Sequence, residues 1–221
     1  KRRCPFVNTA VIFLAGEIKD YSVIKKYTEQ ADFVICADGG TRHADYMNVI
    51  PDMIIGDMDS IDPDLLGKYI GKGVKTRLFK TEKDETDSQL AVDIAFEQGF
   101  KDIVLLGAFG SLPDHTLANV MLLEYIRQKK GTGKIVTDNA ELSIVRNCTE
   151  FDRECFNRIS LIPLTEKVSG ITTAGLKYKL LNDVLYRADT RGISNRFEEE
   201  RVRIEVQEGV LLLVKVREET D

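Results

Sequence analysis

Residues 33–40 read Phe-Val-Ile-Cys-Ala-Asp-Gly-Gly, and residues 53–60 read Met-Ile-Ile-Gly-Asp-Met-Asp-Ser. In both stretches a short apolar run stops at glycine and aspartate. A short, continuous apolar run is typical of a strand that is buried on both faces of a parallel sheet. Ligands of such sheets bind at the carboxyl ends of the strands. The two stretches therefore predict two parallel strands whose ends carry a functional site.

The same pattern extends outward through the first 130 residues. Apolar runs at 11–15 and 103–106 also end at glycine, and amphipathic helical stretches occupy 21–30, 86–98 and 114–130. The helical stretch at 86–98 opens with Thr86-x-x-Gln89, which is a capping-box pattern. Strands that alternate with helices indicate βαβ units and a mostly parallel sheet covered on both faces.

The last 85 or so residues follow a different pattern, because their apolar runs are short and no helical periodicity exceeds two turns. Residues 201–206 alternate strictly between charged and apolar side chains, and 210–216 return after Gly209, which predicts a hairpin. The period changes near residues 129–134. We therefore expect an N-terminal Rossmann-like parallel-sheet domain, residues 1–132, followed by a C-terminal antiparallel β-sandwich domain, residues 133–221.

Composition narrows the class of protein. The chain has 221 residues, of which 43% are hydrophobic and 30% charged, with a net charge of −5. This balance fits a globular protein, and no apolar stretch approaches the ~18 residues of a membrane span. The acidic excess argues against a nucleic-acid partner. The four cysteines form no Cys-x-x-Cys motif, so we expect a cytoplasmic protein with reduced thiols and neither a membrane nor a nucleic acid as partner.

Aspartates are concentrated at the predicted strand ends. Asp57 and Asp59 are two residues apart, so their carboxylates point the same way in an extended segment, and they repel each other unless a cation neutralises them. Asp84 and Asp87, at the start of a predicted helix, can join them. Oxygen ligands without His or Cys suit Mg²⁺. The structural alternative is an exposed turn that caps the next helix.

Glycines supply the second feature of this edge. Gly39 with Gly40, and Gly107 with Gly110, allow backbone N–H groups to approach an anion, and the helix start at Asp114 adds its positive dipole end. The chain contains neither G-x-G-x-x-G nor G-x-x-x-x-G-K-[ST], so a typical dinucleotide or P-loop site is not predicted. A simple tight turn is the alternative for each glycine pair.

His115 and Asn119 lie one helical turn apart, so both can face the same cleft as these glycines. A single histidine on a helix is more often structural than functional.

Taken in order, the motifs resemble those of thiamine pyrophosphokinases. The matching stretches are Ala37-Asp38-Gly39-Gly40, Gly56-Asp57-Met58-Asp59-Ser60, Lys83-Asp84-x-Thr86-Asp87, Gly107-Ala108-x-Gly110 with Asp114-His115-Thr116-x-x-Asn119, Gly175-Leu176-Lys177-Tyr178, Gly192-Ile193-Ser194-Asn195-x-Phe197 and Gly209-Val210-Leu211-Leu212. The resemblance implies transfer of the β,γ-diphosphoryl group of ATP to the hydroxyl of thiamine, with release of AMP. It also implies a homodimer with active sites between subunits.

The resemblance assigns roles to the residues already singled out. Asp57, Asp59 and Asp87 would hold one or two Mg²⁺ ions, with Asp84 close behind, and these four are the catalytic candidates. The nucleotide would meet the following residues: Asp38, Gly39, Gly40, Gly107, Gly110, Asp114, His115 and Asn119. Diphosphoryl transfer needs charge neutralisation and in-line positioning, which this set of residues can provide.

Ser194, Asn195 and Phe197 are the thiamine-binding candidates that the resemblance implies. Without it, a Ser-Asn turn and an aromatic residue of the sandwich core would explain them equally well. Two features depart from the family. Leu112 stands where many relatives have Arg, and the chain has no Trp, which some relatives place beside thiamine.

Two other functions remain open at this point. One is a sensor that binds thiamine or a nucleotide without turnover, which the two departures permit. The other is a diphosphokinase or phosphohydrolase that acts on another alcohol or phosphate ester. The complete set of aspartates favours an enzyme, because a sensor has little use for several converging carboxylates.

Overall fold

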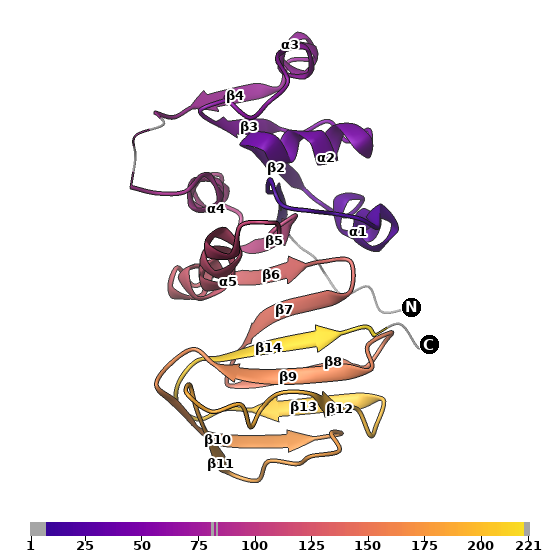
Figure 1. The fold of residues 1–221 in the computed structure, drawn as a ribbon, viewed down its shortest axis with the longest axis vertical. Helices are drawn as coiled ribbons and strands as arrows, with labels where there is room; N and C mark the ends of the chain where they lie inside the picture. The colour runs from indigo at the N-terminus through magenta and orange to yellow at the C-terminus, as the bar shows by residue number, and fades with distance from the viewer. Residues whose placement is uncertain (1–7, 81, 83, 219–221) are drawn as a thin grey trace. The chain divides into compact units, whose positions relative to one another are not determined.

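A computed structural model describes residues 8–80, 82 and 84–218 (Figure 1). The chain divides into two compact units, residues 1–138 and 139–221. The first is an α/β unit with a parallel sheet and the second is built from antiparallel sheets, so the predicted fold class is confirmed. None of the helices in the described part of the chain combines the length and the apolar character that crossing a bilayer requires.

The sheet of the first unit has the strand order β6-β5-β1-β2-β3-β4, and every neighbouring pair is parallel. Its strands are β1 (Thr9–Phe13), β2 (Phe33–Ala37), β3 (Met53–Gly56), β4 (Lys75–Leu78), β5 (Asp102–Leu106) and β6 (Thr132–Val136). Strands β2 to β4 lie on one side of β1, and β5 and β6 lie on its other side, so the order of strand addition switches at β1. Open α/β sheets bind their ligands at such a switch point.

Helices cover both faces of this sheet. They are α1 (Tyr21–Thr28), the 3₁₀ turn η1 (Asp38–Gly40), α2 (Thr41–Tyr46), α3 (Pro63–Gly71), α4 (Asp87–Glu97) and α5 (Pro113–Gln128). Val11 and Phe13 of β1 pack in one core with Ile24 of α1 and Ala44 of α2. The other face is covered by α4 and α5, which contact β1 and β6 respectively and lie on the opposite side from α1 and α2 (Figure 1).

Three elements of this unit escaped the sequence analysis. Two of them are helices α2 and α3, which are six and nine residues long. All four residues of β4 are exposed, because β4 is the edge strand and pairs only with β3 among the described strands. An edge strand with a charged sequence lacks the apolar run by which the other strands were predicted.

Strand β6 places the end of the first unit later than we predicted. It pairs in parallel with β5, with Thr132 opposite Asp102 and Val136 opposite Leu106. Residues 133–136, which we assigned to the C-terminal domain, therefore complete the first sheet, and the division falls after Asp138 instead of residue 132.

The strands of the second unit form two antiparallel layers, with the orders β12-β9-β14-β7 and β11-β10-β13-β8. Its strands are β7 (Ala140–Val145), β8 (Cys148–Asp152), β9 (Arg158–Pro163), β10 (Lys167–Ala174), β11 (Asp183–Tyr186), β12 (Asn195–Arg196), β13 (Arg201–Glu205) and β14 (Leu211–Val216). One core contains Leu161 and Leu213 from the first sheet and Ile171 and Ile204 from the second. The unit is therefore a sandwich.

The hairpin predicted for 201–216 is wrong. Strand β13 pairs with β8 and β10, whereas β14 pairs with β7 and β9 in the other sheet. Strand β13 alternates because it buries one face in the sandwich, whereas β14 has three consecutive buried leucines. Neither pattern shows whether consecutive strands pair or cross between sheets.

Candidate active site

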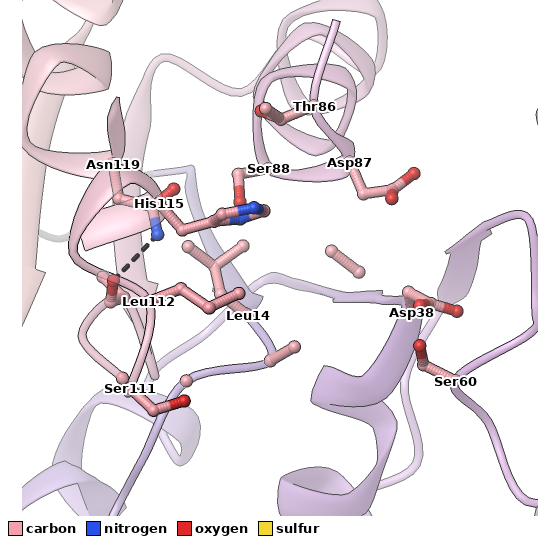
Figure 2. Close-up of a pocket in the computed structure, with 15 residues that line it drawn as sticks. Leu14, Asp38, Ser60, Thr86, Asp87, Ser88, Ser111, Leu112, His115 and Asn119 are labelled. Carbon is pink, nitrogen blue, oxygen red and sulfur yellow. Dashed lines mark hydrogen bonds between the residues drawn. The ribbon is translucent and has the colours of Figure 1, made fainter. Parts of the chain in front are cut away.

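A pocket of about 350 Å³ lies at the carboxyl edge of the first sheet (Figure 2). Its walls are the loops that follow β1, β2 and β5, together with the first turns of α4 and α5. The lining residues are Leu14, Ala15, Gly16, Ala37, Asp38, Ser60, Thr86, Asp87, Ser88, Ala108, Gly110, Ser111, Leu112, His115 and Asn119. The pocket is therefore where the sheet topology predicts a ligand.

Three aspartates meet beside this pocket. Asp38, Asp57 and Asp59 each offer a carboxylate oxygen, and these oxygens lie within 4.8 Å of one another. The register explains the meeting, because Ala37 of β2 is opposite Ile55 of β3 and the chain turns just beyond each of them. The sequence analysis placed Asp57 and Asp59 together but assigned Asp38 to the nucleotide alone.

Gly56 allows the two strand ends to come this close. Its φ is +137°, and a Cβ at this position would lie 2.9 Å from the Cβ of Asp38. Any side chain at residue 56 would therefore push Asp38 away from Asp57 and Asp59, and would also strain the backbone.

The Asp38 carboxylate has an unusual environment. Its Oδ1 is buried and has no hydrogen-bond partner among the described residues, and its backbone is in the left-handed region with φ +44°. Burial raises the pKa of Asp38, the Ser60 hydroxyl opposes this, and the charges of Asp57, Asp59 and Asp87 add to the rise. A cation at this position would relieve both the repulsion and the missing contact.

The donors of this cluster fit Mg²⁺. All three are carboxylate oxygens, which Mg²⁺ prefers, and they leave room for water and phosphate oxygens in its coordination. Inside the cluster, the Asp59 N–H donates to Asp57 Oδ1 at 3.3 Å and the Ser60 hydroxyl donates to Asp59 Oδ1 at 2.9 Å. These bonds hold the loop without using the Asp38 oxygen.

The two other predicted catalytic aspartates occupy different places. Asp87 lies in the first turn of α4 and faces Asp38 across the pocket (Figure 2). It acts on the pKa of Asp38 but is not one of the three clustered carboxylates. Asp84 is exposed and does not line the pocket. Thr86 caps α4 by accepting the Gln89 N–H at 3.2 Å, as its sequence pattern predicts.

Of the remaining predicted nucleotide-binding residues, Gly110, His115 and Asn119 line the pocket. The Asn119 side chain is buried, and its Nδ2 donates to the carbonyl of Ala108 at 2.8 Å. Asn119 therefore holds the loop after β5 in place. His115 is exposed and points into the pocket (Figure 2).

Gly39, Gly40, Gly107 and Asp114 are not among the residues that line the pocket. A Cβ on Gly40 would lie 2.2 Å from the carbonyl oxygen of Phe13, and one on Gly107 would lie 2.6 Å from that of Leu14. Both glycines thus permit close packing behind the pocket wall. The Asp114 carboxylate accepts the N–H of His115 at 2.9 Å in the first turn of α5.

One wall of the pocket, the loop Leu14–Gly16 after β1, was not predicted from the sequence. The available signal was Gly16, which ends the first apolar run as Gly107 ends another. From the sequence we gave it no role. Ser60, Ser88 and the loop together add hydroxyl and backbone groups to the pocket lining.

In the second unit, both the oxygen and the nitrogen of the Asn195 side chain are hydrogen-bonded to the backbone. Its Oδ1 accepts the N–H groups of Tyr178 at 3.0 Å and Arg196 at 2.8 Å, and its Nδ2 donates to the Tyr178 carbonyl at 2.8 Å. Phe197 packs against the core and meets the ring of Phe151 edge to face, with centroids 6.4 Å apart. Ser194 is exposed, with φ +61°. Among these three candidates only Ser194 is exposed.

Comparisons with known proteins support the two-unit reading. Residues 24–135, just over half of the chain, match the family described as "Thiamin pyrophosphokinase, catalytic domain". Residues 148–211 match "Thiamin pyrophosphokinase, vitamin B1 binding domain". The thiamine pyrophosphokinase of Bacillus subtilis is 29% identical over 86% of this chain and 89% of its own length. For thiamine pyrophosphokinase 2 of Arabidopsis thaliana, the identity is 25% over 86% of this chain and 80% of that protein.

Solved structures agree with this assignment. The crystal structure of the Bacillus subtilis thiamine pyrophosphokinase aligns with a TM-score of 0.87 and 25% identity, covering 96% of this chain and all of that one. The yeast thiamin pyrophosphokinase structure, at 18% identity, shares the fold with a TM-score of 0.80 over 95% of this chain and 86% of its own. With its two family matches, its acidic strand ends and its parallel-sheet pocket, the chain belongs to the thiamine pyrophosphokinase family.

Proposed function

We propose that this protein is a thiamine pyrophosphokinase. It transfers the β,γ-diphosphoryl group of ATP to the hydroxyl of thiamine. The hydroxyl oxygen forms a bond to the β-phosphorus, the bond from that phosphorus to the α-phosphate oxygen breaks, and AMP leaves. The hydroxyl proton is lost in the same reaction. The observation that carries the proposal is the meeting of Asp38, Asp57 and Asp59 beside a pocket of the catalytic-domain match.

Asp38, Asp57 and Asp59 would hold Mg²⁺, with Asp87 facing them from α4. When bound, Mg²⁺ neutralises the charge of the phosphate groups and helps to orient them. Asp38 replaces Asp87 in the set of primary candidate ligands that the sequence suggested. Asp87 would approach the same ion from α4, and Asp84 would add only long-range charge.

The pocket loops would receive the nucleotide. Gly110 and Ser111 follow β5, and Ser88 lies in the first turn of α4, where backbone N–H groups favour an anion. Diphosphoryl transfer requires an in-line arrangement of the attacking and leaving oxygens, and walls contributed by several rigid elements can supply it.

Thiamine would bind through the second unit, which corresponds to the vitamin B1 binding domain. Ser194 is the predicted contact that remains exposed, whereas Asn195 would act by fixing the Tyr178 backbone. We retain the homodimer with shared active sites, and a cytoplasmic location, as proposals that rest on the family resemblance.

The test is to incubate the purified protein with thiamine, ATP and millimolar Mg²⁺ and to separate the products by chromatography. The proposal requires AMP and thiamine diphosphate in equal amounts. Binding of thiamine and nucleotide by calorimetry without either product would identify a sensor instead. Product formation only with another alcohol in a substrate panel would identify a different diphosphokinase.

A further inference from the structure

The Leu14–Gly16 loop of the pocket wall is held from behind by two consecutive residues of α2. The Arg42 guanidinium donates to the carbonyls of Ala15 at 2.5 Å and Gly16 at 2.8 Å, and to that of Gly39 at 3.2 Å. His43 Nε2 lies 2.8 Å from the Gly16 carbonyl oxygen. Neither Arg42 nor His43 lines the pocket. Both residues therefore contact the pocket wall from behind and would not contact a bound ligand.

The surroundings of His43 determine which of its nitrogens carries the proton. A carbonyl oxygen only accepts hydrogen bonds, so Nε2 must donate to Gly16. His43 is buried, and burial lowers its pKa. The charge of Arg42 lowers this pKa as well, whereas the hydrogen bond to Gly16 raises it. The ring is therefore neutral, and Nδ1 accepts from the Tyr21 hydroxyl at 2.7 Å. A chain of hydrogen bonds runs from Tyr21 through His43 to Gly16.

The other side of this loop is hydrogen-bonded to the neighbouring loop, which follows β5. The Gly16 N–H donates to the Gly107 carbonyl at 2.8 Å, and the Glu17 N–H donates to that of Phe109 at 2.6 Å. A Cβ on Gly16 would lie 2.3 Å from the Phe109 oxygen, so no side chain can be accommodated at this position. A displacement of Gly16 would consequently move the loops after both β1 and β5.

The charge of the pocket lining explains what the contacts of Arg42 and His43 achieve. Among the described residues that line the pocket, none is Lys or Arg, and Asp38 and Asp87 are acidic. Carbonyl oxygens turned into such a pocket would repel phosphate groups further. Arg42 and His43 draw the Ala15 and Gly16 oxygens to the protein side, and Arg42 adds a positive charge directly behind the wall.

We propose that His43 and Arg42 are positioning residues for the nucleotide: they hold the Ala15–Gly16 wall so that the pocket accepts a nucleoside triphosphate. This inference rests on the proposed function in taking a nucleotide as the occupant. It assigns a role in ground-state nucleotide affinity to residues that do not contact the reacting atoms. Thiamine affinity should not depend on them.

The experiment compares substitutions that remove different parts of the network. His43→Phe keeps a ring but removes both hydrogen bonds, whereas His43→Gln restores a donor at the position of Nε2. Tyr21→Phe removes only the outer hydroxyl. For each variant we would measure the affinity for α,β-methylene ATP by calorimetry with Mg²⁺, the KM values for ATP and thiamine, kcat, and the melting temperature.

We expect His43→Phe to weaken nucleotide binding and raise the KM for ATP about tenfold, as the loss of one buried hydrogen bond implies. His43→Gln should recover most of this loss, and the KM for thiamine should stay within about twofold in all variants. A lower melting temperature with unchanged nucleotide affinity would overturn the inference, because it would show a structural role only. So would an equal rise in both KM values.

Arg42→Gln serves if His43→Phe does not fold, because Arg42 is exposed and its removal leaves the core intact. It should weaken nucleotide binding severalfold, and unchanged affinity would contradict the inference. Nucleotide binding by the wild-type protein without thiamine diphosphate formation would refute the proposed function alone. Failure of the wild-type protein to bind α,β-methylene ATP would overturn the inference itself.

Discussion

The two units arrange neighbouring charged side chains in opposite ways. In the first, Asp38, Asp57 and Asp59 bring like charges together, and one buried oxygen of Asp38 has no hydrogen-bond partner among the described residues. In the second, Lys215 and Glu141 lie opposite each other on β14 and β7, and their charged atoms are 3.0 Å apart. The first arrangement lowers stability and favours the binding of a cation, whereas in the second the two opposite charges neutralise each other.

The same contrast separates predicted site residues from one another. Asn195 was a binding candidate by motif, but its amide makes three hydrogen bonds to the backbone of its own unit. Asp38 was predicted only as a nucleotide contact, yet its buried Oδ1 has no hydrogen-bond partner among the described residues. Polar groups left unsatisfied by the fold are better guides to a ligand than the presence of a polar residue in a motif.

The largest effect should come from breaking the acidic cluster. Asp57→Asn removes one charge from the site, and we expect kcat/KM to fall about a thousandfold, as for the loss of a principal electrostatic group. Without Mg²⁺ the melting temperature should stay the same or rise, because repulsion with Asp38 and Asp59 is relieved. Asp64→Asn, in the exposed first turn of α3, is the matched control. Turnover of Asp57→Asn close to that of this control would remove the metal argument.

Breaking the ion pair of the second unit should act on stability instead. Lys215→Met removes the ammonium group that lies 3.0 Å from the buried Glu141 carboxylate, and we expect a loss of about 3 kcal/mol in the free energy of unfolding, measured with urea. The double change Lys215→Met with Glu141→Leu should recover most of this loss, since both buried charges are then removed together. A double variant as unstable as the single one would show that the packing of Lys215 against Phe156, with Nζ 4.3 Å from the ring centroid, matters more than charge.

Asn195 allows a smaller test of the comparison. Asn195→Ala leaves the N–H and carbonyl of Tyr178 without their partner, which should cost about 1–3 kcal/mol of unfolding free energy. Ser194→Ala, at an exposed neighbouring position, should leave stability unchanged and raise the KM for thiamine. If Asn195→Ala proves fully stable and only thiamine binding suffers, Asn195 contacts the substrate directly and our structural interpretation is wrong.

The smallest effect concerns pH. Burial lowers the pKa of His43 in the folded protein, with Arg42 acting in the same direction, so the unfolded chain binds the proton more readily. Wild-type stability relative to His43→Gln should therefore be constant above the ordinary histidine pKa of about 6.5 and should decline as the pH falls below it. Asp38 titrates in both proteins and cancels in the difference. A difference independent of pH between 7 and 5 would contradict the neutral, buried imidazole.

Much of the first unit could be predicted because its information is local. The buried runs at 33–37 and 53–55, and the glycines and aspartates that follow them, indicate parallel strands with a polar edge whatever the rest of the chain does. The proximity of Asp57 and Asp59 is equally local, since only Met58 separates them, although Met58 has a φ of +68° and the segment is therefore a turn and not the extended chain that we expected. Strand β4 and the true partners of β13 lacked such a signal, because edge exposure and sheet crossing depend on which strands are neighbours.

The sequence by itself determined the class of fold, the acidic strand ends and the family to which the chain belongs, because each depends on residue type and spacing along one strand or helix. Only the tertiary structure decided that Asp38 joins Asp57 and Asp59, that Asn195 is committed to Tyr178, and that His43 reaches Gly16. These contacts depend on the register between strands and on how closely glycine lets two backbones approach. Neither quantity is encoded in any single segment of the chain.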